Sequence, residues 1–358
     1  GRRPAWGSLT GIRPTRLYYQ QLENGKTREE VRRTLSELFD LSQEKIDLLD
    51  EIISAQQGLI DRRARVCDLY VGIPFCTTRC AYCSFSSGEI GDGHLVEPYL
   101  KALFREIEAC AEMAREMGLH VRVGYIGGGT PSSLTTSQLE SLLNHIEKHF
   151  GTMEEFTVEA GRPDTLDEQK LRMIHHHPVT RISINPQTMN DETLVRIGRA
   201  HTAQQTIQAY RLARHIGFDD INMDVIAALP GENYAMFAHT LEEIRKLQPE
   251  SLTVHTLAIK RSSRLHEEKY AQREQDVARM VALGRQTAHE MGMRAYYLYR
   301  QKYMAENLEN VGYALPGCFC RYNIDNMEET TSVLALGAGG ISKCVMREDP
   351  PSTEYSQY

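Results

Sequence analysis

The stretch "YVGIPFCTTRCAYCSF" (70–85) contains three of the eight cysteines of the chain. Cys76, Cys80 and Cys83 have the spacing C-x-x-x-C-x-x-C and directly follow a strand-like run at 68–74. Structural zinc usually takes four protein ligands, and no fourth Cys or His lies nearby in the sequence. Three thiolates around a four-iron cube would leave one iron open to a small molecule. The spacing therefore favours such a cluster, with zinc as the alternative.

Length, net charge and the absence of long apolar runs limit the classes of protein to which the chain can belong. With 358 residues, the chain can form one large α/β domain with appendages, or two domains. A net charge of −7 argues against a nucleic acid as partner. No apolar run approaches the roughly 20 residues of a transmembrane segment, and no signal peptide is visible. We therefore expect a cytoplasmic protein whose grouped cysteines serve metal binding or catalysis. The first residue is Gly1, which suggests an origin in a longer protein.

Strand-like runs alternate with helical ones from Cys67 onward. One predicted helix, 98–117, has Pro98 at its start and Gly118 after its end. Such alternation predicts a parallel sheet with helices outside, and ligands at the carboxyl ends of its strands. Six or seven units fit a full or incomplete (β/α) barrel better than an open sheet, so we predict an α/β fold with a partial (β/α)6-type barrel. The predicted strands are 68–74, 121–127, 155–160, 181–185, 221–229, 251–259 and 293–299.

The regions before and after the predicted barrel have different sequence patterns. Residues 1–14 are rich in Gly, Pro and Arg and predict a loop. Thr27 and Glu30 form a capping box that opens a predicted helix ending near Phe39, and a second helix is predicted from Gln43 to Ile60. We expect an N-terminal helical segment, a barrel and a C-terminal extension. Their boundaries are 1–66, 67–300 and 301–358.

Four further segments accompany the cysteine loop: "IGGGTPS" (126–132), "TVEAGRPDT" (157–165), "RISINPQTMNDETLVRIGRAHT" (181–202) and "INMDVIAALPGE" (221–232). Together with the cysteine spacing, they resemble the radical S-adenosylmethionine (SAM) superfamily. Within it, they resemble the oxygen-independent coproporphyrinogen III oxidase (coproporphyrinogen dehydrogenase) family. The segment "WGSLTGIRPT" near the start resembles the subgroup of that family with an extended N-terminal region.

The resemblance implies a set of cofactors and ligands. One [4Fe–4S] cluster would be held by Cys76, Cys80 and Cys83, and its open iron would bind SAM, of which this branch holds one or two molecules. Backbone at a Gly-rich strand end can approach a ligand closely, and the fork of an arginine suits a carboxylate. The implied cofactor-binding residues are Tyr70, Tyr82, Gly127, Gly128, Gly129, Thr130, Glu159, Gln187, Arg199, Asp224, Ala258 and Ile341. Taken alone, Glu159 could equally form an ion pair inside the barrel.

The resemblance also implies an activity. SAM cleavage would yield a deoxyadenosyl radical that takes hydrogen from a propionate of coproporphyrinogen III, and loss of carbon dioxide and one electron would leave a vinyl group. An external electron donor and acceptor are implied. Two positions depart from the oxidase pattern, since Gly72 stands where the oxidases have His and Phe85 where they often have a further Cys. Phe85 matches the haem chaperones of the family. A haem-binding chaperone and a radical SAM enzyme acting on another tetrapyrrole or an unrelated substrate therefore remain alternatives.

Several further histidines, cysteines and basic residues are candidates for binding roles. We expect solvated or core positions for the histidines at 175–177 and for Cys67, Cys110, Cys318, Cys320 and Cys344. A substrate with several carboxylates needs cationic contacts, although such side chains also occur as ordinary surface charges. The candidates are Arg13, Arg16, Lys260, Arg261, Arg264 and Arg300.

Overall fold

The computed structural model describes residues 4–11, 13–60, 65–267, 276–302 and 304–345. In this part of the chain, one sheet has the strand order β11-β1-β4-β5-β6-β7-β8-β10-β9. The neighbours from β11 to β8 pair in parallel, whereas β10 is antiparallel to both β8 and β9. The strands are β1 (Val66–Ile73), β4 (His120–Gly128), β5 (Glu155–Glu159), β6 (Arg181–Ser183), β7 (Ile221–Ala227), β8 (Ser251–Thr256), β9 (Arg294–Tyr299), β10 (Asn310–Ala314) and β11 (Ser332–Leu336).

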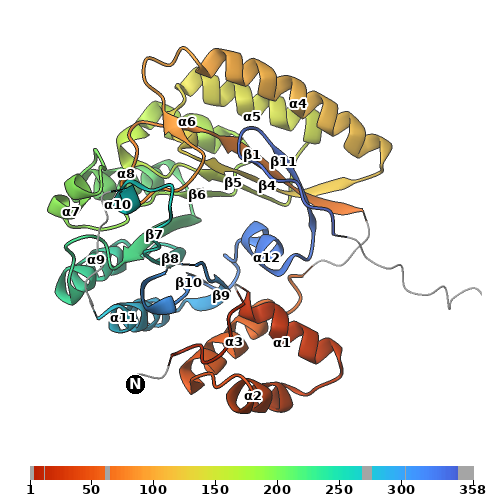
Figure 1. Cartoon of the computed structure of the whole chain (residues 1–358). Coiled ribbons are helices and arrows are strands. Elements are labelled where there is room, and N and C mark those ends of the chain that lie inside the picture. The colour runs from red at the N-terminus through yellow and green to blue at the C-terminus, as the bar shows by residue number, and fades with distance from the viewer. Residues whose placement is uncertain (1–3, 12, 61–64, 268–275, 303, 346–358) are drawn as a thin grey trace, which may run out of the picture.

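The sheet curves, and most of its helices cover the outer side (Figure 1). The run of six parallel strands from β1 to β8 confirms the predicted α/β fold with a partial barrel. A separate pair, β2 (Phe75–Cys76) and β3 (Gly88–Glu89), brackets the cysteine loop. The covering helices are α4 (Val96–Glu116), α5 (Thr136–Phe150), α6 (Glu168–His176), α7 (Asp191–Arg196), α8 (Ala203–Ile216), α9 (Tyr234–Leu247), α10 (Arg264–Glu267) and α11 (Val277–Glu290).

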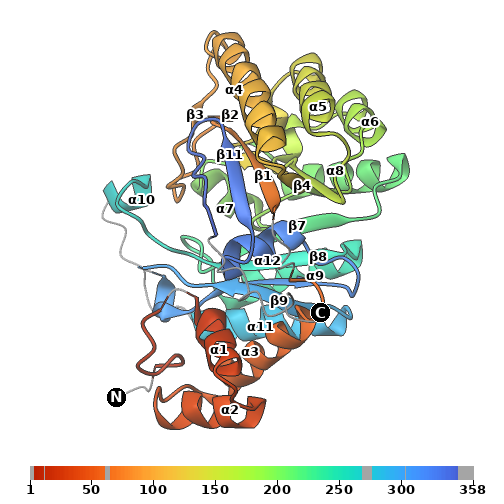
Figure 2. The ribbon, with the colours of Figure 1, turned by 90° about the vertical axis from the view of Figure 1, so that its right-hand side faces the viewer.

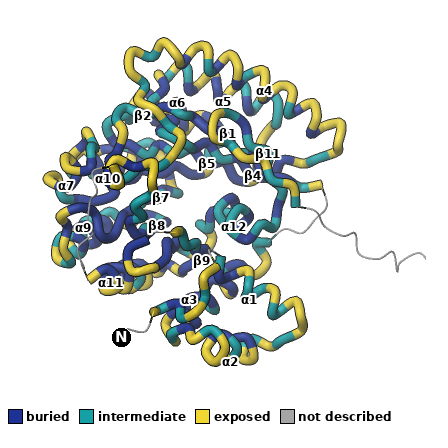
Figure 3. The backbone as a smooth tube through the Cα atoms, viewed as in Figure 1, coloured by how far each residue is buried: buried dark blue, intermediate teal, exposed yellow. Residues whose placement is uncertain are grey.

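Burial follows this layered arrangement. The strands are mostly buried, and exposed residues lie along the outward faces of the helices (Figure 3). On α4, Leu100, Leu103 and Ile107 recur at helical spacing and are buried against the sheet. No described helix is long and apolar enough to cross a membrane.

One helix, α12 (Arg321–Glu328), lies on the concave side of the sheet (Figures 1 and 2). Its Tyr322 stacks on Tyr125 of β4, with ring centroids 4.6 Å apart, and on Tyr70 of β1 at 6.1 Å. Its Asp325 forms a buried ion pair with Arg122 of β4. The helix therefore fills the interior below the carboxyl edge of the strands.

The N-terminal region forms three helices that pack next to β9: α1 (Pro14–Glu23), α2 (Arg28–Glu37) and α3 (Gln43–Ala55). The predicted capping box is present, since Thr27 and Glu30 bond reciprocally at the start of α2. Gln56 donates to the backbone oxygen of Tyr296 at 2.8 Å. The buried Lys45 pairs with Glu309 at 2.6 Å. Glu309 directly precedes β10, so this ion pair connects the N-terminal helices to the main sheet.

The structure departs from the sequence-based expectations in three places. A helix, α1, begins at Pro14, where the sequence analysis predicted none. The helix predicted from Gln43 to Ile60 ends at Ala55, before Gly58 with its positive φ. Strands β10 and β11 come from the region expected as a C-terminal extension, yet they join the main sheet. Residues 61–64 and 346–358 of the expected terminal regions lie outside the described part.

Candidate functional site

The cysteine loop leaves the sheet at the carboxyl end of β1 and is held by the loop after β4. The backbone N–H of Gly129 donates to the Ile73 oxygen, and that of Thr130 to the Phe75 oxygen, both at 2.7 Å. The Thr130 hydroxyl lies 3.5 Å from the sulfur of Cys76. A Cβ at Gly129 would lie 2.6 Å from the Phe75 oxygen and 3.0 Å from the Cys76 sulfur. Only glycine permits this approach of the two loops.

Cys80 is buried against an arginine that the sequence analysis did not single out. Arg162, 2% exposed, donates from Nη1 to the hydroxyls of Thr77 (3.0 Å) and Thr78 (2.6 Å). Its Nη2 donates to the Thr78 carbonyl (2.7 Å) and to the Cys80 sulfur (3.0 Å). Burial raises the pKa of the Cys80 thiol, but the charges of Arg199 and Arg162 outweigh it, so that this pKa lies below its usual value. The thiolate, which is the ligating form, is therefore favoured.

Arg199 lies between the cysteine loop and the strand ends. Its Nη2 donates to the Tyr82 hydroxyl at 3.3 Å, and its Nη1 to the Asn185 carbonyl at 3.1 Å. Its Nε is buried and has no hydrogen-bond partner among the described residues. An arginine with an unpaired Nε next to Cys80 can donate a hydrogen bond to a carboxylate.

Glu159 ends β5 and accepts a hydrogen bond from the Tyr125 hydroxyl. Burial raises the pKa of Glu159 to about 7; the Tyr125 hydrogen bond opposes this increase, and the Asp224 charge adds to it. A Cβ at Gly127 would lie 3.0 Å from the carboxylate of Glu159, so the glycine keeps this side chain close to β4. A carboxyl that titrates near neutral pH therefore faces the barrel interior.

Gln187 and Asp224 are joined through the backbone. Gln187 has a φ of +67°, and its N–H donates to the Asp224 carbonyl at 2.9 Å. The Asp224 carboxylate accepts from Asn222 at 2.8 Å and lies 3.6 Å from the ring of His255. Burial raises the pKa of Asp224, but His255 and Asn222 lower it more, so this carboxyl is ionised at neutral pH. The buried Oε1 of Gln187 has no partner among the described residues.

The remaining predicted residues lie on β1, at the end of β4 and in the segments after β8 and β11. Gly128 ends β4 with a φ of +105°, and Tyr70 lies on β1. Ala258 follows β8 and forms a bridge with Met304. Ile341 is 75% exposed in the segment after β11 and makes none of the contacts that join the other residues. The structure thus brings all but Ile341 to the carboxyl ends of the strands or their loops.

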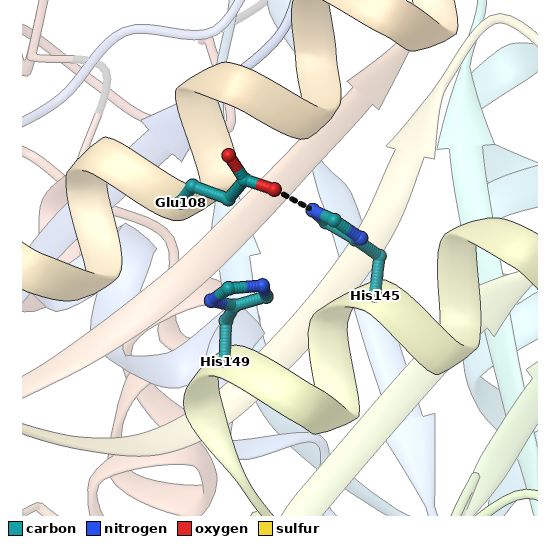
Figure 4. A group of neighbouring side chains, drawn as sticks. All are labelled: Glu108, His145 and His149. Atoms are coloured by element: carbon teal, nitrogen blue, oxygen red, sulfur yellow. Dashed lines mark ion pairs between the residues drawn. The ribbon is translucent and has the colours of Figure 1, made fainter.

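The spacing of the cysteines bears on the zinc alternative. Sulfur ligands 2.3 Å from one tetrahedral zinc ion lie about 3.8 Å apart. Among the described residues, the three-member group whose ligand atoms lie within 4.8 Å of one another is Glu108, His145 and His149 (Figure 4), and not the cysteines. At least one pair of the three cysteine sulfurs therefore lies farther apart than one zinc ion requires.

Several cationic candidates are engaged elsewhere. Arg13 and Arg16 form ion pairs with Glu329. Arg300 donates to the Leu9 carbonyl at 2.7 Å and lies over the Trp6 ring. These three side chains therefore serve the N-terminal packing. The loop of Lys260, Arg261 and Arg264 instead meets the cysteine loop, since the Leu265 N–H donates to the Ala81 carbonyl at 3.0 Å.

The other cysteines and the histidine run occupy ordinary positions. Cys67 and Cys320 are buried, Cys110 and Cys318 are partly exposed, and Cys344 is exposed. His176 ends α6, as predicted for the histidine run. None of these residues belongs to the described group of close metal ligands.

Comparison with known proteins identifies the family. Residues 70–244 match the model of the radical SAM superfamily. The chain is 42% identical to the oxygen-independent coproporphyrinogen-III oxidase-like protein HemZ of Bacillus subtilis, over 98% of this chain and 72% of HemZ. The chain belongs to the radical SAM coproporphyrinogen III oxidase family. Members of this enzyme superfamily use an iron–sulfur cluster and SAM.

Other relatives cover less of the chain. It is 35% identical to the heme chaperone HemW of B. subtilis, over 53% of this chain and 50% of HemW. It therefore spans only half of that relative. The solved structure of the Escherichia coli coproporphyrinogen III oxidase HemN, a radical SAM enzyme, superposes with a TM-score of 0.65 at 23% identity. This match covers 79% of this chain and 66% of HemN, and it shows that the fold is shared.

The residues at this edge suit the two groups that the superfamily uses. Three thiols on one loop, of which Cys80 tends toward its thiolate, provide the donors for a cluster. The unpaired Nε of Arg199 and Oε1 of Gln187 provide a buried donor and a buried acceptor for a polar ligand. The ionised Asp224 adds an acceptor for hydroxyl groups.

Proposed function

We propose that this family member catalyses the oxygen-independent oxidative decarboxylation of coproporphyrinogen III, converting propionate side chains to vinyl groups in the cytoplasm. The main support is the 42% identity to HemZ along nearly the whole chain. The assembly of the cysteine loop with Glu159, Gln187, Arg199 and Asp224 at one edge of the sheet supports it independently.

The residues of the chain would have the following roles. Cys76, Cys80 and Cys83 would hold the cluster. Arg199 would bind the carboxylate of SAM, and Asp224 its ribose hydroxyls. When bound, the cluster and SAM supply a reductive cleavage that generates a hydrogen-abstracting radical. The number of SAM molecules, one or two, is part of this proposal.

The remaining steps depend on placement. A propionate would lose one hydrogen atom, then carbon dioxide and one electron to an external acceptor, which leaves a vinyl group. The protein positions the reacting carbon and keeps water out. Lys260, Arg261 and Arg264, on the loop that meets the cysteine loop, are the candidates for the other substrate carboxylates.

A haem-binding chaperone is the second candidate function, because two observations favour it. Phe85, the residue shared with the chaperone pattern, is 68% exposed next to the cysteine loop. At Gly72, a Cβ would lie 2.9 Å from the Ala338 carbonyl, so the segment after β11 leaves no room for the histidine of the oxidase pattern. The identity to HemW over half of the chain agrees with either function.

The test is anaerobic reconstitution with iron, sulfide, SAM and a reductant, followed by mass analysis of added coproporphyrinogen III. Two successive losses of the elements of formic acid are expected. Stoichiometric haem binding without a vinyl product would support the chaperone instead. Deoxyadenosine formation with the porphyrinogen unchanged and no haem binding would point to another substrate.

A further inference from the structure

We propose that Arg162 raises the reduction potential of the cluster by donating a charge-assisted hydrogen bond to the sulfur of Cys80. The inference rests on the proposed function, since it requires a cluster on the three cysteines. Arg162 stands in "EAGRPDT", three residues after the end of β5. It would be a positioning and tuning residue that acts through the cysteine.

The contacts of Arg162 are concentrated on one short segment of the cysteine loop. Its two terminal nitrogens donate to Thr77, Thr78 and Cys80 at 2.6–3.0 Å. The Thr78 hydroxyl in turn donates to the Gly198 carbonyl at 2.8 Å. Arg162 therefore fixes the loop that presents Cys80, and it does so from a fully packed position.

No carboxylate among the described residues contacts the Arg162 guanidinium directly, although burial's increase of the pKa of nearby Asp164 is outweighed by its His201 contact and by the Arg162 charge. Among the described residues, no carboxylate oxygen lies within 4 Å of its guanidinium, whereas the buried Arg181 pairs with Glu155 at 3.2 Å and with Asp220 at 2.7 Å. The nearby Asp164 accepts from Thr77 at 3.2 Å instead. A buried cation needs a compensating anion. Of the groups that Arg162 contacts, only the Cys80 sulfur can carry that charge.

The consequence for the cluster follows from electrostatics. Reduction adds one electron to the cluster, and a buried positive charge with a donor on a ligating sulfur stabilises the more negative state. Loss of the Arg162 charge therefore makes reduction harder. A purely mechanical role, in which Arg162 only fixes the loop, would change how much cluster is held but not its potential.

Two matched variants separate these roles. Arg162→Gln removes the charge but keeps a donor of shorter reach. Thr78→Val removes one acceptor of Arg162 without changing any charge. Each full-length protein is reconstituted anaerobically, its iron and sulfide are counted, and its reduction is followed by electron paramagnetic resonance (EPR) at controlled potentials.

We expect the ratio of reduced to oxidised cluster at a given potential to fall about tenfold in Arg162→Gln, which corresponds to about 59 mV for one electron. Thr78→Val should hold less iron at an unchanged potential. Arg162→Lys keeps the charge and should give a smaller decrease, which covers the case in which Arg162→Gln holds no cluster. A wild-type potential in every Arg162 variant that holds cluster would overturn the inference. A wild-type protein without cluster would overturn the proposed function itself.

We also infer a zinc site between α4 and α5, formed by Glu108, His145 and His149 (Figure 4). The histidines lie one turn apart on α5 and so share a face. The His145 Nε2 lies 3.2 Å from the Glu108 carboxylate, and the His145 ring stacks on Phe104 at 4.5 Å. Two imidazoles and one carboxylate form a common set of zinc ligands.

A second observation indicates that His149 lacks a binding partner within the described residues, as a metal ligand would. The Nε2 of His149 is buried and has no partner among the described residues, which is costly for a polar atom. Rotation of the half-exposed Glu108 would complete the site.

The test is zinc titration of the cluster-loaded protein against a competing chelator. Wild type should bind one zinc ion more than His145→Ala/His149→Ala, and Glu108→Gln should weaken that binding. His239→Ala, on an exposed position of α9, is the matched control and should bind as wild type does. Equal zinc stoichiometry in wild type and the double variant would overturn this second inference.

Discussion

Two buried arginines show how differently the two ends of the barrel are built. Arg122, 1% exposed, lies below the site, forms an ion pair with Asp325 of α12 and lies 3.7 Å from Asp68 of β1. Arg162, 2% exposed, lies at the carboxyl edge and contacts two threonines and a cysteine, but no carboxylate in the described part of the chain. Arg122 thus lies beside two carboxylates of the chain, whereas Arg162 presents its charge to the Cys80 sulfur.

The contrast extends to the surroundings of each arginine. Around Arg122, stacked tyrosines fill the interior. Around Arg162, the buried Nε of Arg199 and Oε1 of Gln187 lack partners among the described residues. Among the described residues, both buried oxygens of Asp68 beside Arg122 also lack a hydrogen-bond partner, so the difference between the two ends lies in the carboxylate pairing of the two arginines. The following changes test this difference, in order of decreasing expected effect.

Replacing Cys80 by Ala should abolish the cluster, because it removes one of the three proposed ligands and the sulfur to which Arg162 donates. We expect SAM cleavage to fall more than about 100-fold, since even second-shell changes at metal sites cost roughly 10- to 100-fold. The measurement is the iron content and deoxyadenosine formation. Cys320→Ala, at another buried cysteine outside the loop, is the control and should hold the full cluster.

Replacing Arg122 by Met should act on stability and not on the cluster. The change leaves buried carboxyl groups without their cation, which costs about 3–5 kcal/mol of unfolding free energy. Denaturant unfolding measures the loss. Neutralising Asp68 and Asp325 to Asn in the same protein should recover part of it. A loss of cluster without a loss of stability would contradict the division between the two ends.

Glu159 gives the carboxyl edge a pH dependence. Burial raises the pKa of Glu159 from 4.5 to about 7, so the folded state holds this proton more tightly than the unfolded chain. The contribution of Glu159 to the free energy of unfolding is therefore most favourable below pH 4.5, and it declines as the pH rises to about 7. The decline amounts to about 3 kcal/mol.

The matched variant is Glu159→Gln, compared with wild type by urea unfolding of the cluster-free protein at pH 5 and pH 8. We expect the unfolding free energy of Glu159→Gln, minus that of wild type, to be larger at pH 8 than at pH 5. An equal difference at both pH values would show that the carboxyl is not perturbed.

Gly129→Ala should have the smallest effect of the four. Its Cβ would lie 2.6 Å from the Phe75 oxygen and 3.0 Å from the Cys76 sulfur, so the cysteine loop must shift. Overpacking of this kind costs about 1–3 kcal/mol. Iron content after reconstitution should fall, whereas Gly88→Ala, with open space around its Cβ, should match wild type.

The sequence contained the signals for the parallel part of the fold. Alternating strand and helix patterns predicted the strands from β1 to β8, and the loop of Cys76, Cys80 and Cys83 lies at the predicted edge. The position of β10 between β8 and β9 was not predictable, because the order of strands depends on tertiary pairing and not on local pattern. The same applies to α12, whose contacts with β1 and β4 join residues far apart in the sequence.

The site shows the same limit. Residues with a family pattern could be predicted, but Arg162, Tyr125 and His255 could not. The contact of Arg162 with Cys80 spans 82 residues, and a lone arginine after a strand is usually a surface charge. One signal was available, since Arg162 lies within the quoted segment "TVEAGRPDT", three residues after Glu159.

The most direct test of the central claim is the EPR spectrum of the anaerobically reconstituted, reduced protein with and without SAM. The claim is that Cys76, Cys80 and Cys83 hold a four-iron cluster whose fourth iron binds SAM. A [4Fe–4S] signal that changes when SAM is added, and that is absent from the triple Cys→Ala protein, is the predicted result. A signal that SAM leaves unchanged, or one that survives the loss of all three cysteines, would contradict the account.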